Sequence, residues 1–295
     1  MSTATPSDPT AGQSVEVSSG VTLVGDAWGD PNAQPALLLH GGGQTRHAWS
    51  GTGQTLAAAG WYALAFDQRG HGDSSWCPEG DYDPDRFAAD VVAIVETLPA
   101  PPVLVGASLG GMASLMSIAR SEPGYARALV LVDIATRMEE QGIQRIFDFM
   151  KQEPEGFATL DDAADAVAAY NPNRPRPKDV QGLAKNLRQG DDGRWRWHWD
   201  PRFLSGKHVP HVTGSERATS LDDAVRNLDI PTLLVRGRQS DVLSEEGAQH
   251  FLSLAPNAEF ADITGAGHMV AGDRNDAFAG AVVDFLRKRE LGPRR

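Results

Sequence analysis

The chain has 295 residues and a formal net charge of −12, which argues against nucleic acid and anionic membrane surfaces as partners. Its hydrophobic fraction of 41% and charged fraction of 22% are typical of a globular protein with a sizeable core. Cys77 is the single cysteine, which excludes an intrachain disulfide and a thiolate metal cluster. We expect a small molecule as the partner and leave a homodimer open.

The N-terminal residues 1–14 are rich in Ser, Thr and Pro, without a basic start or an apolar stretch. This composition predicts a disordered tail rather than a signal peptide. No apolar run approaches the length of a membrane span. We therefore expect the protein in the cytoplasm.

After the tail, apolar runs of strand length alternate with longer segments that have helical spacing of their apolar residues. Runs that are apolar throughout, such as 36–39, are expected where a strand is buried on both faces of a parallel sheet. The pattern predicts an α/β fold with a mostly parallel central sheet flanked by helices. The predicted strands are 14–18, 21–28, 36–39, 62–66, 103–105, 128–132, 232–235 and 259–263, and the predicted helices are 49–59, 86–98, 244–254 and 273–289.

The alternation stops between residues 136 and 228, where the chain is polar and the helical segments are interrupted. We predict a helical cap over residues 136–228, inserted into a core formed by 15–135 and 229–295. Trp195, Trp197 and Trp199 alternate here, so they can share one face of an extended segment. They line an apolar pocket or anchor the cap on the core, and anchoring is the commoner fate of tryptophan.

A β-branched apolar run ends in Gly106-x-Ser108-x-Gly110, and a helical pattern follows at once. This predicts a strand, a sharp turn and a helix, with the serine hydroxyl exposed at the turn. The strained turn requires small residues two positions away from the serine, and both glycines meet that need. The alternative is an ordinary strand-to-helix turn with a serine N-cap.

A glycine run, His40-Gly41-Gly42-Gly43, follows the predicted strand 36–39. It could cradle a phosphate, but no Gly-Lys-Ser/Thr follows and the spacing of a dinucleotide-binding loop is missing. The other interpretation is a loop whose N–H groups face an oxyanion, which fits a nucleophilic serine further along the chain. We favour the oxyanion loop, with His40 supporting it.

The polar loop 67–74 carries several charges beside its glycines. These charges could be catalytic, but we favour the interpretation that they satisfy loop backbone groups and each other. We expect His71 and Cys77 to be structural.

Reactive side chains follow several strands of the predicted sheet, and sites gather at the carboxyl ends of parallel strands. Ser108, Asp241 and His268 occur in that order. A serine hydroxyl needs a base to take its proton, and histidine serves when an acid fixes its tautomer. Asp133, which ends the strand 128–132, is the alternative acid.

From about residue 15 to 289, the chain resembles the α/β-hydrolase family, on five motifs in order: His40-Gly41-Gly42-Gly43, Asp67-x-Arg69-Gly70-x-Gly72-x-Ser74, Gly106-x-Ser108-x-Gly110, Arg236-Gly237-x-x-x-Asp241 and Gly265-x-Gly267-His268. It looks most like the capped esterases, C–C hydrolases and epoxide hydrolases. Epoxide hydrolases and haloalkane dehalogenases normally have aspartate where Ser108 stands, so a serine nucleophile disfavours those activities.

The resemblance implies a role for each matching residue. Ser108 is the nucleophile, His268 the general base and then acid, and Asp241 the residue that orients His268. The backbone N–H groups of Leu109 and Gly42 form the oxyanion hole, with Gly41 or Gly43 as alternatives to Gly42.

Several apolar residues flank the catalytic positions and are candidates for the substrate pocket: Trp49, Met112, Met269 and Val270, with Trp197 from the cap and Gly41 from the glycine loop. We expect hydrolysis of a small to medium apolar ester or lactone through an acyl-enzyme, with no metal or organic cofactor. The same residues also suit a C–C bond hydrolase or an acyltransferase or perhydrolase. A receptor-like binding module on the hydrolase fold is the alternative of a different class.

Overall fold

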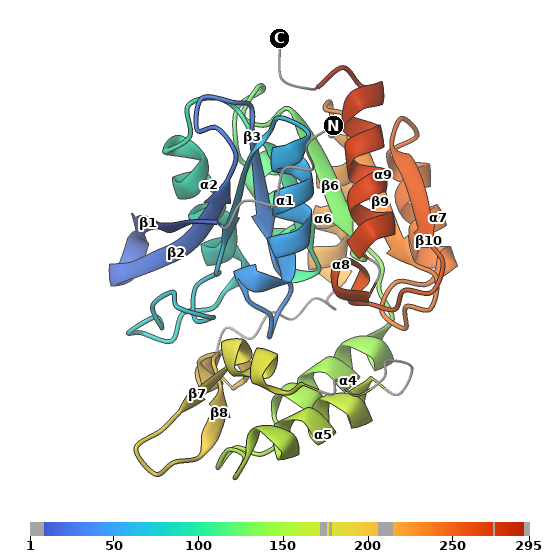
Figure 1. Cartoon of the computed structure of the whole chain (residues 1–295). Coiled ribbons are helices and arrows are strands. Elements are labelled where there is room, and N and C mark those ends of the chain that lie inside the picture. Colours follow the sequence, from blue (N-terminus) through green and yellow to red (C-terminus); the bar gives the residue numbers. More distant parts are fainter. Residues whose placement is uncertain (1–8, 172–175, 177–178, 206–214, 274, 292–295) are drawn as a thin grey trace, which may run out of the picture.

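The computed structural model describes residues 9–171, 176, 179–205, 215–273 and 275–291. Within these residues, a sheet of eight strands has the order β1-β2-β4-β3-β5-β6-β9-β10 (Figure 1). The first three strands in this order pair antiparallel, and all later neighbours pair parallel. The strands are β1 (Thr10–Val17), β2 (Val21–Trp28), β3 (Pro35–Leu39), β4 (Tyr62–Phe66), β5 (Val103–Ala107), β6 (Ala128–Val132), β9 (Thr232–Gly237) and β10 (Glu259–Ile263).

Helices cover both faces of the sheet. One face is covered by α1 (Ser50–Ala58), the short α8 (Val270–Asp273) and α9 (Asn275–Lys288). The other face is covered by α2 (Pro84–Glu96), α3 (Leu109–Ala119), α6 (Ser215–Arg226) and α7 (Glu245–Leu254). None of the described helices has the length and apolar character that a membrane crossing needs.

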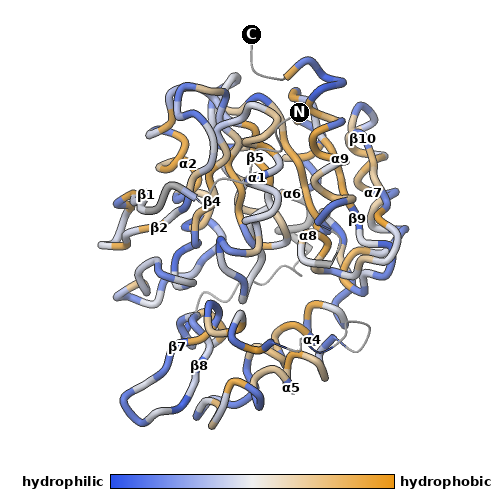
Figure 2. The backbone as a smooth tube through the Cα atoms, viewed as in Figure 1, coloured by the Kyte–Doolittle hydropathy of each residue, from blue (hydrophilic) through white to orange (hydrophobic). Residues whose placement is uncertain are grey.

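Alternate residues of the parallel strands enter the two halves of the core. In β3, Leu37 and Leu39 join the cluster under α2 and α3, whereas Ala36 and Leu38 join the cluster under α1 and α9. Successive side chains of a strand point to opposite faces, so a strand covered on both faces must be apolar throughout. Figure 2 shows this concentration of apolar residues along the inner strands. The predicted α/β fold with a mostly parallel sheet is confirmed.

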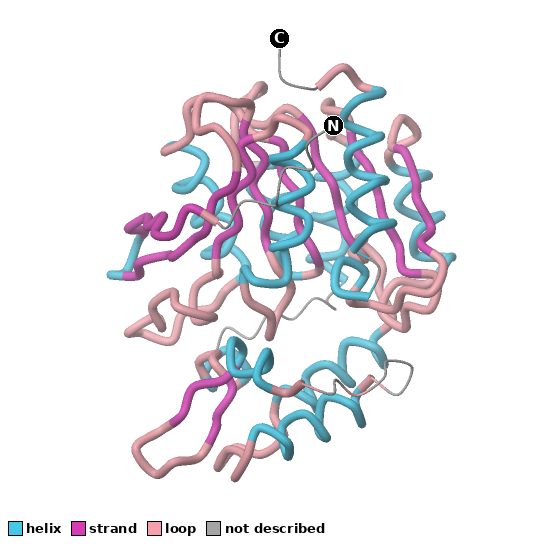
Figure 3. The backbone as a smooth tube through the Cα atoms, in the orientation of Figure 1, coloured by secondary structure: helices cyan, strands magenta, loops and turns pink. Residues whose placement is uncertain are grey.

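A second layer lies beyond the carboxyl ends of the parallel strands (Figures 1 and 3). We call this layer, formed by the described residues between 140 and 204, the cap. It contains helices, as expected of the predicted helical cap, and in addition a hairpin of two short strands. The cap elements are α4 (Glu140–Met150), α5 (Leu160–Tyr170), the 3₁₀ helix η3 (Gln181–Asn186), β7 (Leu187–Gln189), β8 (Trp195–Trp197) and the 3₁₀ helix η4 (Pro201–Leu204).

Two predicted boundaries need correction. The tail predicted over residues 1–14 ends earlier, because β1 begins at Thr10 and pairs with β2, while residues 1–8 lie outside the described part. The cap predicted to reach residue 228 ends before α6. Leu221 and Val225, one helical turn apart, are buried in the core cluster that α3 and α7 share, so α6 belongs to the core.

Candidate active site

Ser108 sits at the turn between β5 and α3 with φ 46° and ψ −112°, a left-handed conformation that is rare for a residue with a side chain. The turn is tightly packed. A Cβ atom on Gly106 would lie 2.4 Å from the carbonyl carbon of Gly110, and one on Gly110 would lie 2.3 Å from the Leu39 oxygen. The predicted need for glycine on both sides of Ser108 is confirmed.

His268 follows β10, and its Nδ1 lies 2.7 Å from Oδ2 of Asp133, the residue directly after β6. The Asp133 carboxylate is fully buried. Its Oδ1 accepts the Gly237 N–H at 2.8 Å, and its Oδ2 also accepts the Ser240 hydroxyl at 2.5 Å. An Nδ1–H that donates to this carboxylate leaves Nε2 of His268 as the ring atom that can accept a proton.

Asp241 does not contact His268, and the prediction that it orients this histidine is wrong. Its Oδ2 pairs with Arg145 of the cap helix α4 at 2.9 Å, and its side chain is 36% exposed. The physical reason is the turn after β9. The Ser240 hydroxyl accepts the N–H groups of Val242 and Leu243 at 3.1 Å each while it donates to Asp133, so Ser240 points inward and Asp241 outward.

The glycine loop after β3 has one N–H group left without an internal acceptor. The Gly41 N–H donates to Oε1 of Gln44, and the Gly43 N–H donates to Nε2 of His71, both at 3.1 Å. Among the described residues, the Gly42 N–H has no such partner. The Leu109 N–H is in the first turn of α3, where a helix leaves its N–H groups free. Gly42 and Leu109 are therefore the two predicted donors that remain available.

Two buried histidines support the glycine loop as neutral rings. His40 Nδ1 lies 2.8 Å from the Gly41 oxygen, and His40 Nε2 accepts the Gln68 N–H at 3.0 Å. His71 Nδ1 lies 3.0 Å from the Arg69 oxygen while its Nε2 accepts from Gly43. Burial lowers the pKa of His40 to about 4 and that of His71 to about 3, so both rings are neutral at pH 7.

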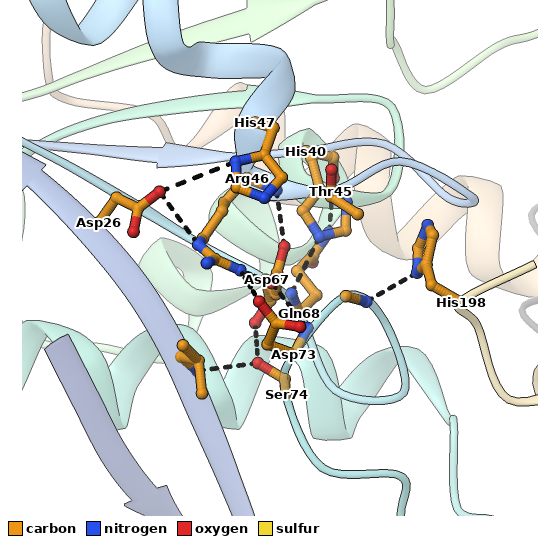
Figure 4. Close-up of polar contacts among 12 residues, drawn as sticks. Asp26, His40, Thr45, Arg46, His47, Asp67, Gln68, Asp73, Ser74 and His198 are labelled. Carbon is orange, nitrogen blue, oxygen red and sulfur yellow. Dashed lines mark hydrogen bonds and ion pairs between the residues drawn. The ribbon is translucent and has the colours of Figure 1, made fainter. Parts of the chain in front are cut away.

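The charged groups of the loop after β4 are paired, as predicted, but their ion-pair partners lie outside the loop. Figure 4 shows Arg46 between Asp26 and Asp67, with Asp73 as a further partner. Asp67 also accepts the backbone N–H of Arg46 at 2.6 Å. In the same loop, Arg69 makes a two-pronged ion pair with Asp90, at 2.5 and 2.6 Å. These charges hold the loop in place and are not available for chemistry.

Ser108 and His268 line one cavity of about 670 Å³ between the strand ends and the cap. The glycine loop forms part of its wall, and α4 and α5 provide much of its apolar surface. Ser108, a histidine with a buried carboxylate partner, and the backbone of Gly42 and Leu109 therefore line one mainly apolar cavity. This arrangement can carry out acyl transfer.

The sequence model described as the alpha/beta hydrolase family matches residues 36–281 of the chain. The chain belongs to this family. An esterase of Mycobacterium tuberculosis is 28% identical over 273 residues, which cover 89% of this chain and 85% of the relative. A non-heme chloroperoxidase of Kitasatospora aureofaciens is 28% identical over 283 residues, which cover 91% of this chain and 97% of the relative. The crystal structure of E-2-(acetamidomethylene)succinate hydrolase superposes with a TM-score of 0.81 at 22% identity, over 94% of this chain and 98% of that one.

Four of the pocket residues predicted for this α/β hydrolase do line the cavity: Gly41, Met112, Trp197 and Met269. Trp49 and Val270 do not, and those two predictions are wrong. Both are 1% exposed and belong to the core cluster under α1 and α9, where the Trp49 ring lies 5.7 Å from that of Phe278. Their side chains point into the helical layer, away from the strand ends.

The sequence analysis missed three residues at this site. From the cap, Met150 and Phe203 contact the glycine loop: a Cβ on Gly43 would lie 3.1 Å from Met150, and one on Gly42 would lie 3.7 Å from Phe203. No local signal links these residues to a loop that is more than 100 positions away. Ser240 was also missed, although its place beside Asp241 after a strand could have marked it.

Proposed function

We propose that this α/β hydrolase is a serine hydrolase that cleaves a small to medium apolar carboxylic ester or lactone through an acyl-enzyme. The observation that carries the proposal is the 2.7 Å contact between His268 Nδ1 and the buried Asp133 carboxylate, in a cavity that His268 shares with Ser108. A buried carboxylate on Nδ1 is what a histidine base needs. Asp133 takes the role that the sequence analysis gave to Asp241.

In the proposed reaction, the Ser108 oxygen attacks the substrate carbonyl carbon while Nε2 of His268 takes the hydroxyl proton. Asp133 stabilises the imidazolium that forms. The carbonyl oxygen becomes an oxyanion that accepts the N–H groups of Gly42 and Leu109, the latter at the positive end of α3. The carbon–oxygen bond to the alcohol breaks as His268 returns the proton. Water, deprotonated by His268, then releases the acid from Ser108.

The test measures the hydrolysis of aliphatic ethyl esters by proton release, in the parent and in Ser108→Ala. We expect kcat/KM of the variant to fall about 10³-fold or more, the scale of a lost nucleophile. A fluorophosphonate should modify the parent once, at Ser108. Full activity in Ser108→Ala, or a parent that hydrolyses no ester, would overturn the proposal, and C–C substrates would be tested next.

The similarity to a non-heme chloroperoxidase over 91% of the chain favours a second candidate, in which hydrogen peroxide replaces water as the acyl acceptor. Attack of peroxide on the acyl-enzyme releases a peroxy acid and restores the Ser108 hydroxyl. Peroxy acid formation from an ester plus hydrogen peroxide, lost in Ser108→Ala, supports this activity. Carboxylic acid as the only product rejects it.

A further inference from the structure

Four aromatic side chains of the cap form a continuous row, and all four line the cavity of Ser108. Tyr170 stacks on Phe149 with ring centres 4.3 Å apart and planes at 20°. Phe149 contacts Trp197 at 5.5 Å, and Trp197 stacks on Trp199 at 5.0 Å and 11°. We call these residues the aromatic row. It joins α4, α5 and the strand β8 across the roof of the cavity.

Packing within the cap does not bury the row completely. Phe149, Tyr170 and Trp197 are each only partly buried, whereas core aromatics such as Trp49 and Phe278 are at most 1% exposed. Since the three rings line the cavity, part of the surface that they leave exposed lies there. An apolar surface that shares a cavity with the proposed nucleophile is a place for substrate.

Aliphatic residues adjoin the row in the cavity lining, although Asn171, next to Tyr170, also lines it. Ile146 precedes Phe149 by three residues on α4, and Val167 precedes Tyr170 by three on α5, so each pair lies on one face of its helix. Both aliphatic residues also line the cavity. On the faces of α4 and α5 that carry Phe149 and Tyr170, the wall therefore offers apolar contact and ring stacking.

We propose that the substrate is an ester with a flat aromatic group that packs against the aromatic row while its carbonyl group reaches Ser108. This inference rests on the proposed esterase function. Any apolar group of the right size would gain from leaving water. Only a planar π system gains in addition from stacked or edge-to-face contact with the rings. The row therefore selects for aromatic over saturated rings of similar size.

Trp195 provides a matched control within the same strand, β8. Its side chain packs against the small cap cluster around Phe157 and Leu187 and is not part of the cavity lining. Replacing Trp195 removes the same side chain from the same hairpin without touching the proposed substrate site. An effect of Trp197→Leu that Trp195→Leu lacks is then an effect of the cavity.

The test compares ethyl 3-phenylpropanoate with ethyl 3-cyclohexylpropanoate, which share a leaving group and chain length and differ in the ring. Proton release avoids chromogenic alcohols, which would themselves add an aromatic ring. We expect the parent to prefer the phenyl ester by about three- to tenfold in kcat/KM, the scale of an aromatic pair contact. Trp197→Leu and Phe149→Leu should bring this ratio close to one, and Trp195→Leu should leave it unchanged.

A ratio of one or less in the parent would overturn the inference, as would an unchanged ratio in both cavity variants. If Trp197→Leu does not fold, Phe149→Leu on α4 carries the test. Hydrolysis of ethyl butanoate and labelling of Ser108 by a fluorophosphonate separate the two proposals. A parent that hydrolyses butanoate without preferring the phenyl ester is an esterase for which the aromatic inference is wrong. A parent that hydrolyses none of these esters refutes the esterase proposal itself.

Discussion

The loops that follow β6 and β9 lie side by side at the carboxyl ends of these neighbouring parallel strands, and each contains an aspartate. Asp133, after β6, is fully buried and accepts from a backbone N–H, a hydroxyl and an imidazole. Asp241, after β9, is partly exposed and meets one arginine of the cap. The two carboxylates therefore differ in what they can do, although both end neighbouring strands. A position at the end of a strand brings a residue near the site. The difference between the two aspartates comes from burial and from the number of hydrogen-bond donors around each carboxylate.

The largest effect should come from neutralising the two carboxylates in turn. Asp133→Asn keeps the shape of the side chain but favours the wrong tautomer of His268, so we expect kcat to fall by about 10⁴-fold. Asp241→Asn, its matched control on the neighbouring strand end, should stay within about threefold of the parent, since an exposed ion pair contributes little. Steady-state ester hydrolysis checks both. Equal losses of kcat in the two variants would show that the two carboxylates do not differ in function.

The contrast between buried and exposed groups extends to acid stability. The folded state keeps His40 and His71 neutral down to pH values of about 4 and about 3, whereas the unfolded chain protonates them below about 6.5. The unfolded state thus binds more protons, and the free energy of unfolding must fall as pH falls from 6.5. Each histidine adds a slope of up to about 1.4 kcal/mol per pH unit.

Urea unfolding between pH 7 and 5 measures this slope above the range in which ordinary carboxylates titrate. The variant His71→Gln keeps an amide oxygen that can accept the Gly43 N–H. It should lower the pH dependence of the free energy of unfolding by the contribution of one histidine. A stability that does not change with pH over this range would show that the two rings are not held neutral by burial.

A smaller effect is expected from Ser240, which donates to the same Asp133 oxygen as His268. Ser240→Ala removes one of three donors and leaves the carboxylate less firmly placed. A hydrogen bond to a charged group contributes about 1.5–3 kcal/mol, so we expect kcat to fall by about tenfold or somewhat more, with KM little changed. Recovery of kcat in Ser240→Thr would assign the loss to the hydroxyl. A change in KM alone would contradict a role through Asp133.

The smallest effect should come from Arg145, the partner of Asp241. Its side chain is 56% exposed, and exposed ion pairs typically contribute about 0.2–1 kcal/mol, less at high salt. Arg145→Gln should therefore lower the melting temperature by a few degrees at most. The difference from the parent should shrink between 50 mM and about 1 M sodium chloride, because added salt screens the pair. A large loss of catalysis shared by Arg145→Gln and Asp241→Asn would place Asp241 back in the mechanism.

Local signals in the sequence were enough to predict the sheet, most helices and the tight turn at Ser108. The predicted helix over residues 244–254 coincides with α7, whose N-cap residue Ser244 accepts the Gly247 N–H. Gly106 and Gly110 flank Ser108 because the turn has no room for a Cβ. Each of these features depends on residues a few positions apart, so it can be recognised from a short stretch of sequence.

The failures concern relations between distant residues or the direction of a side chain. Choosing Asp133 over Asp241 requires the pairing of β6 with β9, which no motif records. Trp49 and Val270 are close to site residues in the chain, but their side chains face the opposite way. The end of the cap was misplaced because α6 has only a short apolar stripe, at Leu221 and Val225, to mark its return to the core.

Ser108 and Asp133 share a strained backbone conformation, which limits how the stability of such a protein can evolve. Both have positive φ values, 46° and 51°, although neither is glycine. Backbone conformations of this kind cost about 1–3 kcal/mol each, so the fold is less stable than a chain without them. Ser108→Gly should therefore be more stable to urea than Ser108→Ala, and equally inactive. Evolution from this sequence toward higher thermal tolerance must find its gains elsewhere, because relieving the strain at these two positions would remove the proposed chemistry.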